Sequence, residues 1–446
     1  MRVELTGHYG VWRLIRTSLP LIAMMIITSI YSVVDGFFVS NFAGSTAFAS
    51  LNLIWPVIAL AGAIGLMSGT GGSALVSKLL GEGNDDRARS VFTTIVLITS
   101  ATGVILSVIL FLLMEPLAIA LGAEGAMIGK AVTYGRITVA GLPGYILQMT
   151  FQSFYMTAEK PQLGTVMSII CGCVNILLDA LFIALFGWGL AGAAIATALS
   201  LAAGGAYPLY YFSSRRNRSH LRFVAIKSVD WKSIGRTCTN GMSEYVGNIA
   251  LNIVSIGYNF QLMRYAGENG VSAYGIIMYV GFILAAIFIG YNLCVSQVIA
   301  YNYGAGNREE LRSLLHKSLG IIGVSGILLT VTAELSAPAI AGLFVGYDPE
   351  LCDLTVRALR IYMLCFLLCG FNMFCSAWFT ALNNGIVSAV AAFARTLVFE
   401  LASVFVLPAF LGIDGIWMAV NVAEVLAFIL SAVLILCYRE RYLGAR

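Results

Sequence analysis

Twelve long apolar runs are the feature that most constrains what this chain can fold into. A helix that crosses a bilayer needs about 20 predominantly apolar residues, and twelve such runs fit along the 446 residues, of which only 11% are charged. A soluble domain carries about 25% charged residues. The sequence therefore predicts an all-α polytopic membrane protein with twelve transmembrane helices. The predicted spans are 17–40, 46–77, 90–114, 130–157, 163–186, 190–213, 237–263, 271–300, 314–337, 355–381, 386–410 and 414–438.

Lysine and arginine are distributed unevenly between the connections. With the amino terminus inside, 20 of the 26 basic residues lie on the cytoplasmic side and five on the outer side. Cytoplasmic loops of membrane proteins carry this excess, so we expect both termini in the cytoplasm. The basic segment 214–236 divides the spans six and six. It predicts a cytoplasmic linker between an N-lobe, 1–213, and a C-lobe, 237–446.

The two halves of the chain repeat. LGEGNDDRARS at 80–90 and YGAGNREELRS at 303–313 are 223 residues apart, and other short matches share that offset. Because six is an even number of spans, both halves enter the membrane in the same direction. The repeat is therefore parallel, and substrate sites of such folds lie where the repeats meet.

Polar side chains in three first-half spans form the candidate coupling site. Asn175 and Asp179 are four residues apart in an apolar run, so a helix places both on one face. Ionisable residues at membrane depth are costly and mark functional sites. Counting roughly 1.5 Å per residue from the predicted span ends, Asp35, Asp179 and Thr197 fall in the outer half of the membrane. Two carboxylates there predict a site that binds a proton or a cation; the alternative is a polar pair that joins two helices.

The second half does not repeat this pattern. At the offset of 223, Asp35 corresponds to Tyr258 and Asp179 to Ala402. Arg395 is the one basic residue well inside a span. We expect it to form a structural ion pair with Glu400, with Glu424 as the alternative partner.

A substrate cavity between the halves is predicted from polar, aromatic and methionine side chains in the spans. Such linings suit adaptable binding of amphipathic molecules, although most of these residue types in a bundle only pack. The candidates are Tyr31, Tyr145, Gln148, Met149, Asn252, Tyr279, Asn372, Met373 and Trp378.

The sequence lacks the residues and motifs that several other classes of protein need. The three histidines, His8, His220 and His316, lie outside the predicted spans or at their ends, so we expect neither a metal centre nor a membrane-embedded enzyme. No G-x-x-x-x-G-K-[ST] motif indicates ATP binding. We expect no cofactor and no nucleic-acid partner, and a monomer.

Four motifs, VVDGFFVSNFAG, GEGNDDRAR, TAEKPQLG and NILLD, resemble the MATE family of multidrug and toxic compound extrusion transporters, in particular its MepA-like bacterial branch. The resemblance covers essentially the whole chain. It implies a V-shaped pair of six-helix lobes in the bacterial inner membrane that exports organic, often cationic, molecules by alternating access in exchange for H⁺ or Na⁺. It also implies that Asp35, Asn175, Asp179 and Thr197 form the coupling site.

The NorM-like branch places acids in the seventh and tenth spans, and the corresponding stretches NIALNIVSIGYNF and IYMLCFLLCGFNMFCSAWFTAL contain none. This departure argues against a cation site of that kind in the second lobe. The alternative reading within the superfamily is a flippase for a lipid-linked precursor. Such proteins tend to have a strongly basic cavity, which this sequence does not predict.

Overall fold

The computed structural model describes residues 4–38, 45–214, 217, 219–226 and 229–444. Within these ranges the regular structure is entirely helical. The helices, in chain order, are α1 (Val11–Phe38), α2 (Ser45–Gly81), α3 (Asp85–Ala120), α4 (Ala126–Ala140), α5 (Leu142–Thr157), α6 (Pro161–Asp179), the π-helix η2 (Ala180–Leu185), α7 (Gly189–Ser213), α8 (Trp231–Gly304), α9 (Arg308–Val345), α10 (Pro349–Met363), α11 (Phe366–Ala381), α12 (Gly385–Phe393), the π-helix η3 (Ala394–Glu400), α13 (Leu401–Val406), α14 (Pro408–Leu411) and α15 (Ile413–Leu443).

These helices account for twelve spans. In the described part of the chain, nine helices are long and apolar enough to cross a membrane, and α10 with α11 forms a tenth span bent by 45°. Helix α8 has 74 residues and contains a sharp bend at Gly267, where φ is 58°, so it supplies two spans. Helices α4 and α5, which meet at Gly141, occupy the remaining predicted span, 130–157.

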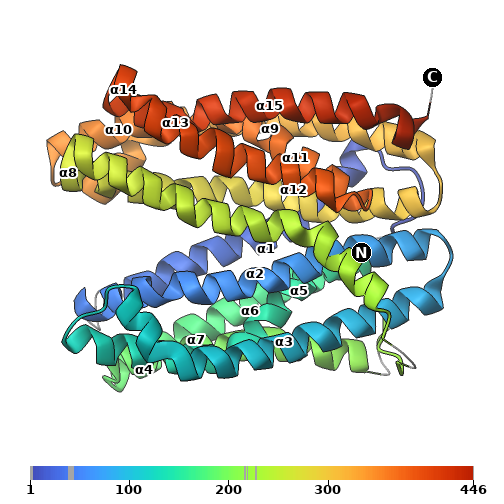
Figure 1. The fold of residues 1–446 in the computed structure, drawn as a ribbon, viewed down its shortest axis with the longest axis horizontal. Helices are drawn as coiled ribbons and strands as arrows, with labels where there is room; N and C mark the ends of the chain where they lie inside the picture. Colours follow the sequence, from blue (N-terminus) through green and yellow to red (C-terminus); the bar gives the residue numbers. More distant parts are fainter. Residues whose placement is uncertain (1–3, 39–44, 215–216, 218, 227–228, 445–446) are drawn as a thin grey trace.

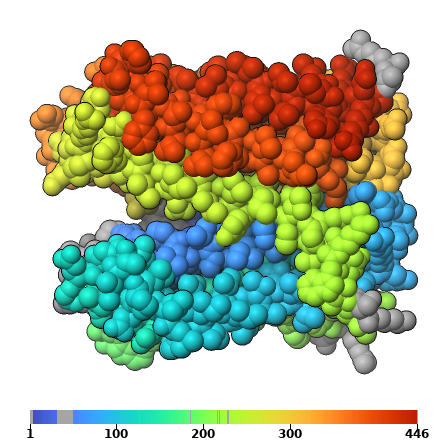
Figure 2. Space-filling model, viewed as in Figure 1, coloured from blue at the N-terminus to red at the C-terminus, as the bar shows by residue number. Residues whose placement is uncertain are grey.

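The helices pack as two lobes. In Figure 1, α1 to α7 form the lower group and α8 to α15 the upper group. Figure 2 shows a cleft between the lobes at the end of the molecule opposite the carboxy terminus. We call the closed end, which carries the carboxy terminus and the turns after α2 and α8, the terminal end. The predicted fold class, twelve helices in two lobes with a V shape, is confirmed.

Helix α8 begins earlier than predicted. The expected span started at residue 237, after a linker that ended at 236, whereas α8 starts at Trp231. The reason is local, since the side chain of Asp230 accepts a hydrogen bond from the backbone N–H of Ser233 at 3.0 Å and caps the helix.

The internal repeat is also visible in the structure, because turns occur at equivalent positions of the two lobes. Gly83 and Gly306 are 223 residues apart, and both have positive φ, 74° and 68°. Gly189 and Gly412 have the same separation and φ of 55° and 60°. Glycine adopts this left-handed region without steric cost, so the repeat shapes the backbone as well as the sequence.

The lobes touch at backbone level at the terminal end. Helix α2 of the first lobe crosses both arms of α8. A β-carbon built on Gly241 would overlap the carbonyl oxygen of Met67, and one on Gly304 would overlap that of Lys78. Residues without side chains let helices approach this closely. At these two glycines α2 and α8 therefore pack directly against each other, backbone against backbone.

Buried hydrogen bonds and the amino-terminal segment reinforce this contact. The side chain of Gln297 in α8 accepts from Ser77 at 3.0 Å and from Thr157 at 3.2 Å, and it donates to Ser73 at 2.9 Å. The amino-terminal segment bridges both lobes. The N–H of Leu5 donates to Glu159 at 2.9 Å in the first lobe, and the N–H of Tyr9 donates to Glu310 at 2.8 Å in the second.

Candidate functional site

Asn175 and Asp179 are buried in the first lobe. Asn175 is 2% exposed and Asp179 is fully buried. Helix α6 starts with Pro161 in its first turn, where a proline costs no backbone hydrogen bond. It ends at Asp179, where the chain continues as the π-helix η2. Single π-helical turns occur often at functional sites.

Helix α1 runs alongside α6 in a fixed register. The side chain of Met24 lies against Gly164, and the hydroxyl of Thr28 lies 3.4 Å from that of Ser168. Both contacts have the same offset of 140 residues. Because the two helices are parallel, the same offset extended by two turns places the backbone of residue 35 level with Asn175. The side chain of Asp35, and that of Tyr31, lie outside the described residues.

Helix α7 brings Thr197 to the same level from the other side. Gly192 of α7 packs against the backbone of Phe182, and Gly204 packs against the Sγ of Cys171. The two helices are therefore antiparallel. Counting between these contacts places Thr197 between the levels of Asn175 and Asp179.

Two polar atoms at this level have no hydrogen-bond partner among the described residues. These are the Oδ1 of Asn175 and the Oγ1 of Thr197, which is 7% exposed. An unpaired buried oxygen costs about 1–3 kcal/mol, and a bound cation offsets that cost. Amide, hydroxyl and carboxylate oxygens are the ligands that hard cations take. The geometry therefore suits a proton or a small hard cation. In the described part of the chain, no group of three or more His, Cys, Asp or Glu side chains could hold a metal ion.

The residues predicted to line a cavity are not gathered on one surface. Gln148 and Met149 are buried in the first lobe, where Gln148 faces Gly204 of α7. Tyr145 packs against Gly62 of α2, and its ring centroid lies 6.1 Å from that of Trp55.

In the second lobe, the predicted cavity residues divide into buried and exposed ones. Trp378 and Asn372 are each 3% exposed, and Met373 is partly buried against the same core. Tyr279 is 45% exposed, and Asn252 is exposed. Of these five, only Tyr279 and Asn252 present a substantial surface.

The ion pair of Arg395 differs from the predicted one. Its Nε and Nη2 donate to the same carboxylate oxygen of Glu424, at 2.8 and 2.5 Å, and not to Glu400. Arg395 and Glu400 both lie in the π-helix η3, so packing between helices, and not spacing within one helix, selects the partner of Arg395. Helix α15 instead brings Glu424 against η3. Asn372 completes the pair by donating to the other oxygen of Glu424 at 2.6 Å.

The contacts that close the terminal end are the residues that sequence reasoning missed. Gln297 and the crossing glycines lie in apolar runs, where glycine and amide residues also occur as ordinary packing. The offset between the halves marked the loops around Gly81 and Gly304, but it gave no sign that these two turns touch α8 and α2.

Comparison with known proteins adds to this geometry. The sequence model of the MatE family matches residues 20–181 and 245–406, once in each half. The chain is 24% identical over 425 residues to the multidrug export protein MepA of Staphylococcus haemolyticus, covering 95% of this chain and 93% of that protein. The Staphylococcus aureus protein of the same name is 21% identical over 424 residues, with the same coverage.

Solved structures share the fold. One is described as an outward-facing multidrug resistance MATE family transporter and is 22% identical, with a TM-score of 0.91 and 98% of both chains covered. Another, a MOP superfamily transporter from Pyrococcus furiosus described as having a binding pocket of reverse polarity, is 21% identical, with a TM-score of 0.88 and the same coverage.

Proposed function

Because this chain belongs to the MATE family of transporters, we propose that it is a secondary antiporter that exports organic, often cationic, molecules in exchange for H⁺ or Na⁺. The chain is a multi-pass membrane transporter and not an enzyme. In our proposal it works as a monomer in the bacterial plasma membrane, with both termini in the cytoplasm, and it uses neither ATP nor another cofactor.

One observation carries the proposed coupling site. Asn175, Asp179 and Thr197 are buried at one level of α6 and α7, and two of their oxygens lack a partner in the described structure. Burial disfavours the charged form of a carboxyl, whereas a nearby cation favours it. In our proposal Asp179 therefore alternates between a protonated state and one that holds a cation. Asp35 joins the proposed site because its backbone lies level with Asn175 on the adjacent helix.

The arrangement of the lobes supports alternating access. The cleft is open at one end, and the lobes are in contact at the terminal end. In our proposal the cleft faces outward in this state. Binding of the coupling ion at the first lobe then shifts the equilibrium between two arrangements, which requires that the ion bind them with different affinity. In our proposal the coupling ion binds one arrangement of the lobes more tightly, and the exported molecule binds the other more tightly.

Transport in everted vesicles tests the role of Asp179. Efflux of a fluorescent organic cation is driven by a proton gradient alone and then by a sodium gradient alone. The gradient that drives the wild type identifies the coupling ion. We expect Asp179→Asn to abolish the driven efflux while the protein remains inserted and folded.

The matched control is Asp353→Asn, which removes a carboxylate from an exposed position of α10. It should transport as the wild type does. Undiminished efflux by Asp179→Asn would remove this residue from the mechanism. Loss of efflux in both variants would point to a general effect of charge.

A further inference from the structure

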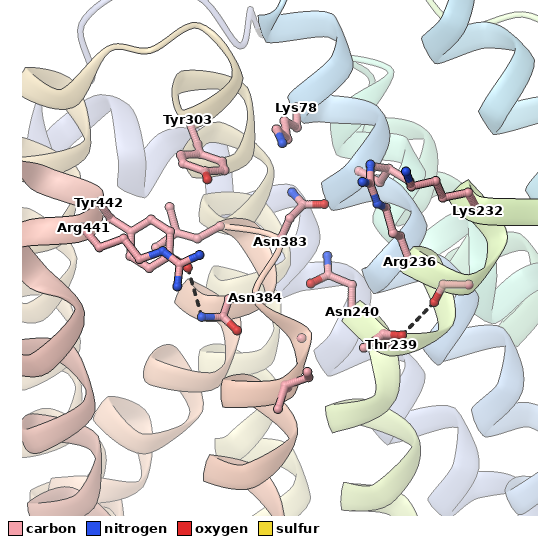
Figure 3. A pocket seen from close by; sticks show the side chains of 15 residues that line it. Lys78, Lys232, Arg236, Thr239, Asn240, Tyr303, Asn383, Asn384, Arg441 and Tyr442 are labelled. Atoms are coloured by element: carbon pink, nitrogen blue, oxygen red, sulfur yellow. Dashed lines mark hydrogen bonds between the residues drawn. The ribbon is translucent and has the colours of Figure 1, made fainter.

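A cavity of about 510 Å³ lies at the terminal end, between the lobes. Helix α2 lines it from the first lobe. Both arms of α8, the turn between α11 and α12, and the end of α15 line it from the second lobe. The close-up in Figure 3 shows its side chains arranged around an open centre. None of these residues belongs to the proposed coupling site.

Four cationic side chains line this cavity, and no carboxylate does. Lys78 comes from α2, Lys232 and Arg236 come from the first turns of α8, and Arg441 comes from the end of α15. Figure 3 shows the α8 pair on one side and Arg441 on the other. Lys78 also lies 3.6 Å from Glu82, outside the lining. Like charges brought together in this way attract an anion.

Amide groups add hydrogen-bonding capacity at the base of the cavity. Asn240 is 3% exposed, its Nδ2 donates to the carbonyl of Thr380 at 2.9 Å, and its Oδ1 has no partner within the described residues. Asn383 holds a positive φ of 57° in the adjoining turn. Asn384 donates to the hydroxyl of Tyr442 at 3.0 Å. The cavity is thus built from fixed polar groups as well as from flexible basic side chains.

We propose that this cavity binds a phosphate-bearing anion, either the headgroup of an acidic lipid or a free phosphate. Guanidinium and ammonium groups bind phosphate through charge-assisted hydrogen bonds. The carboxamide of Asn240 belongs to the same lining, with its Oδ1 buried. The position at the helix ends places the cavity where acidic headgroups meet basic residues of a membrane protein.

Occupation of this cavity favours the closed terminal end. Lys78 belongs to the first lobe, whereas the other three cations belong to the second lobe. An anion contacts both groups only while α2 and α8 are together, as in this structure. A ligand that binds one arrangement better than the other shifts the population toward it. The anion therefore stabilises the state in which the opposite end is open.

The test uses the full chain in nanodiscs of phosphatidylcholine at constant ionic strength. In one arm, inorganic phosphate is titrated against matched chloride. In the other arm, phosphatidylglycerol replaces part of the phosphatidylcholine, without free phosphate. The readouts are the thermal unfolding midpoint and hydrogen exchange in the segments 75–82 and 299–306. We expect the wild type to unfold at higher temperature and to exchange more slowly in at least one arm, and the responding arm identifies the source.

Two charge-matched variants make the result specific to the cavity. Lys232→Gln with Arg236→Gln removes two lining cations and should weaken the apparent affinity about tenfold or more, since hydrogen bonds to charged groups are strong. Arg222→Gln with Arg439→Gln removes the same charge outside the cavity and should respond as the wild type does. Arg441→Gln is the second lining variant, should the double variant fold poorly. No response in either arm, or an equal loss in the lining and control variants, would overturn the proposal.

Discussion

The hydroxyl of Ser77 donates a hydrogen bond of 3.0 Å to the side chain of Gln297, across the junction between the two lobes. Gln297 is 1% exposed and Ser77 is fully buried. Ser73 and Thr157 share the same amide group. A buried polar group that loses its partner carries the full cost of desolvation. These four residues therefore favour contact at the terminal end, and they must separate whenever that end opens.

Gln297→Leu should open the terminal end. The substitution removes three hydrogen bonds across the junction, each of which contributes about 1 kcal/mol, and it leaves two serines and a threonine buried without this partner. We expect the open population to rise about tenfold or more. Faster hydrogen exchange in the segment 73–77 would report it. Gln261→Leu is the control, because Gln261 lies on the same helix and donates to Val404 within the second lobe. An equal change in both variants would contradict a role at the junction.

Gly241→Ala should act in the same direction through sterics. The added methyl would overlap the carbonyl oxygen of Met67, which is backbone and cannot rotate away. Overpacking of this kind costs about 1–3 kcal/mol, and here it penalises only the closed junction. Exchange in the segment 67–71 should rise. Gly247→Ala on the same helix meets nothing within 4 Å, so it should leave exchange unchanged.

Substitutions of Thr197 distinguish two roles for this residue, an oxygen ligand of the coupling ion and a packing residue. If its hydroxyl helps to hold the coupling ion, Thr197→Val should weaken the apparent affinity for that ion in vesicle efflux about tenfold. Thr197→Ser keeps the oxygen and should retain most of the affinity. Equal behaviour of the two variants would assign Thr197 to packing alone.

Breaking the Arg395–Glu424 pair should destabilise the second lobe strongly. Glu424 is 2% exposed, and the pair is completed by Asn372. Removing one partner leaves a buried charge unpaired, at about 3–5 kcal/mol. We expect Arg395→Met to lower the thermal unfolding midpoint markedly. Arg395→Met combined with Glu424→Met should recover much of the loss, and a double variant as unstable as the single one would contradict this account.

Asp230 makes the stability of the α8 start depend on pH. Hydrogen bonds from the Ser233 side chain and backbone lower the pKa of the Asp230 carboxyl below its usual value, and Arg87 adds to the effect. A lowered pKa in the folded state means that the stabilisation is present above the unfolded-state pKa and is lost as the pH falls through the folded-state pKa. Asp230→Ala should cost about 1 kcal/mol near neutral pH. The difference from the wild type in thermal unfolding should shrink as the pH is lowered through the acidic range. Asp230→Asn keeps a capping side chain and should lose the pH dependence with little loss of stability.

The sequence predicts the spans well because a bilayer imposes one length and one composition on every crossing helix. It also predicts the burial of Asn175 and Asp179, since two polar residues one turn apart in a long apolar run share one side of the helix. The common level of Thr197 and Asp179 follows from counting residues along antiparallel helices. The role of these residues in coupling remains a prediction.

Features that depend on which helices are neighbours could not be predicted. Arg395 had two candidate partners in the sequence, and only the packing of α15 against η3 selects Glu424. The crossing of Gly241 with Met67 requires the angle and offset between α2 and α8, which no local pattern encodes. The capped start of α8 was hidden because the residues after Asp230 are polar, although that aspartate is a good capping residue.

Helix α8 contacts α2 at two places, near residue 241 in the arm before Gly267 and near residue 304 in the arm after it. The arms meet at Gly267 with no loop between them. A movement of one arm is therefore transmitted to the other arm, because no flexible loop between them can absorb it. We expect the two contacts to break together. The terminal end should therefore open in a single cooperative step, with no stable half-open intermediate.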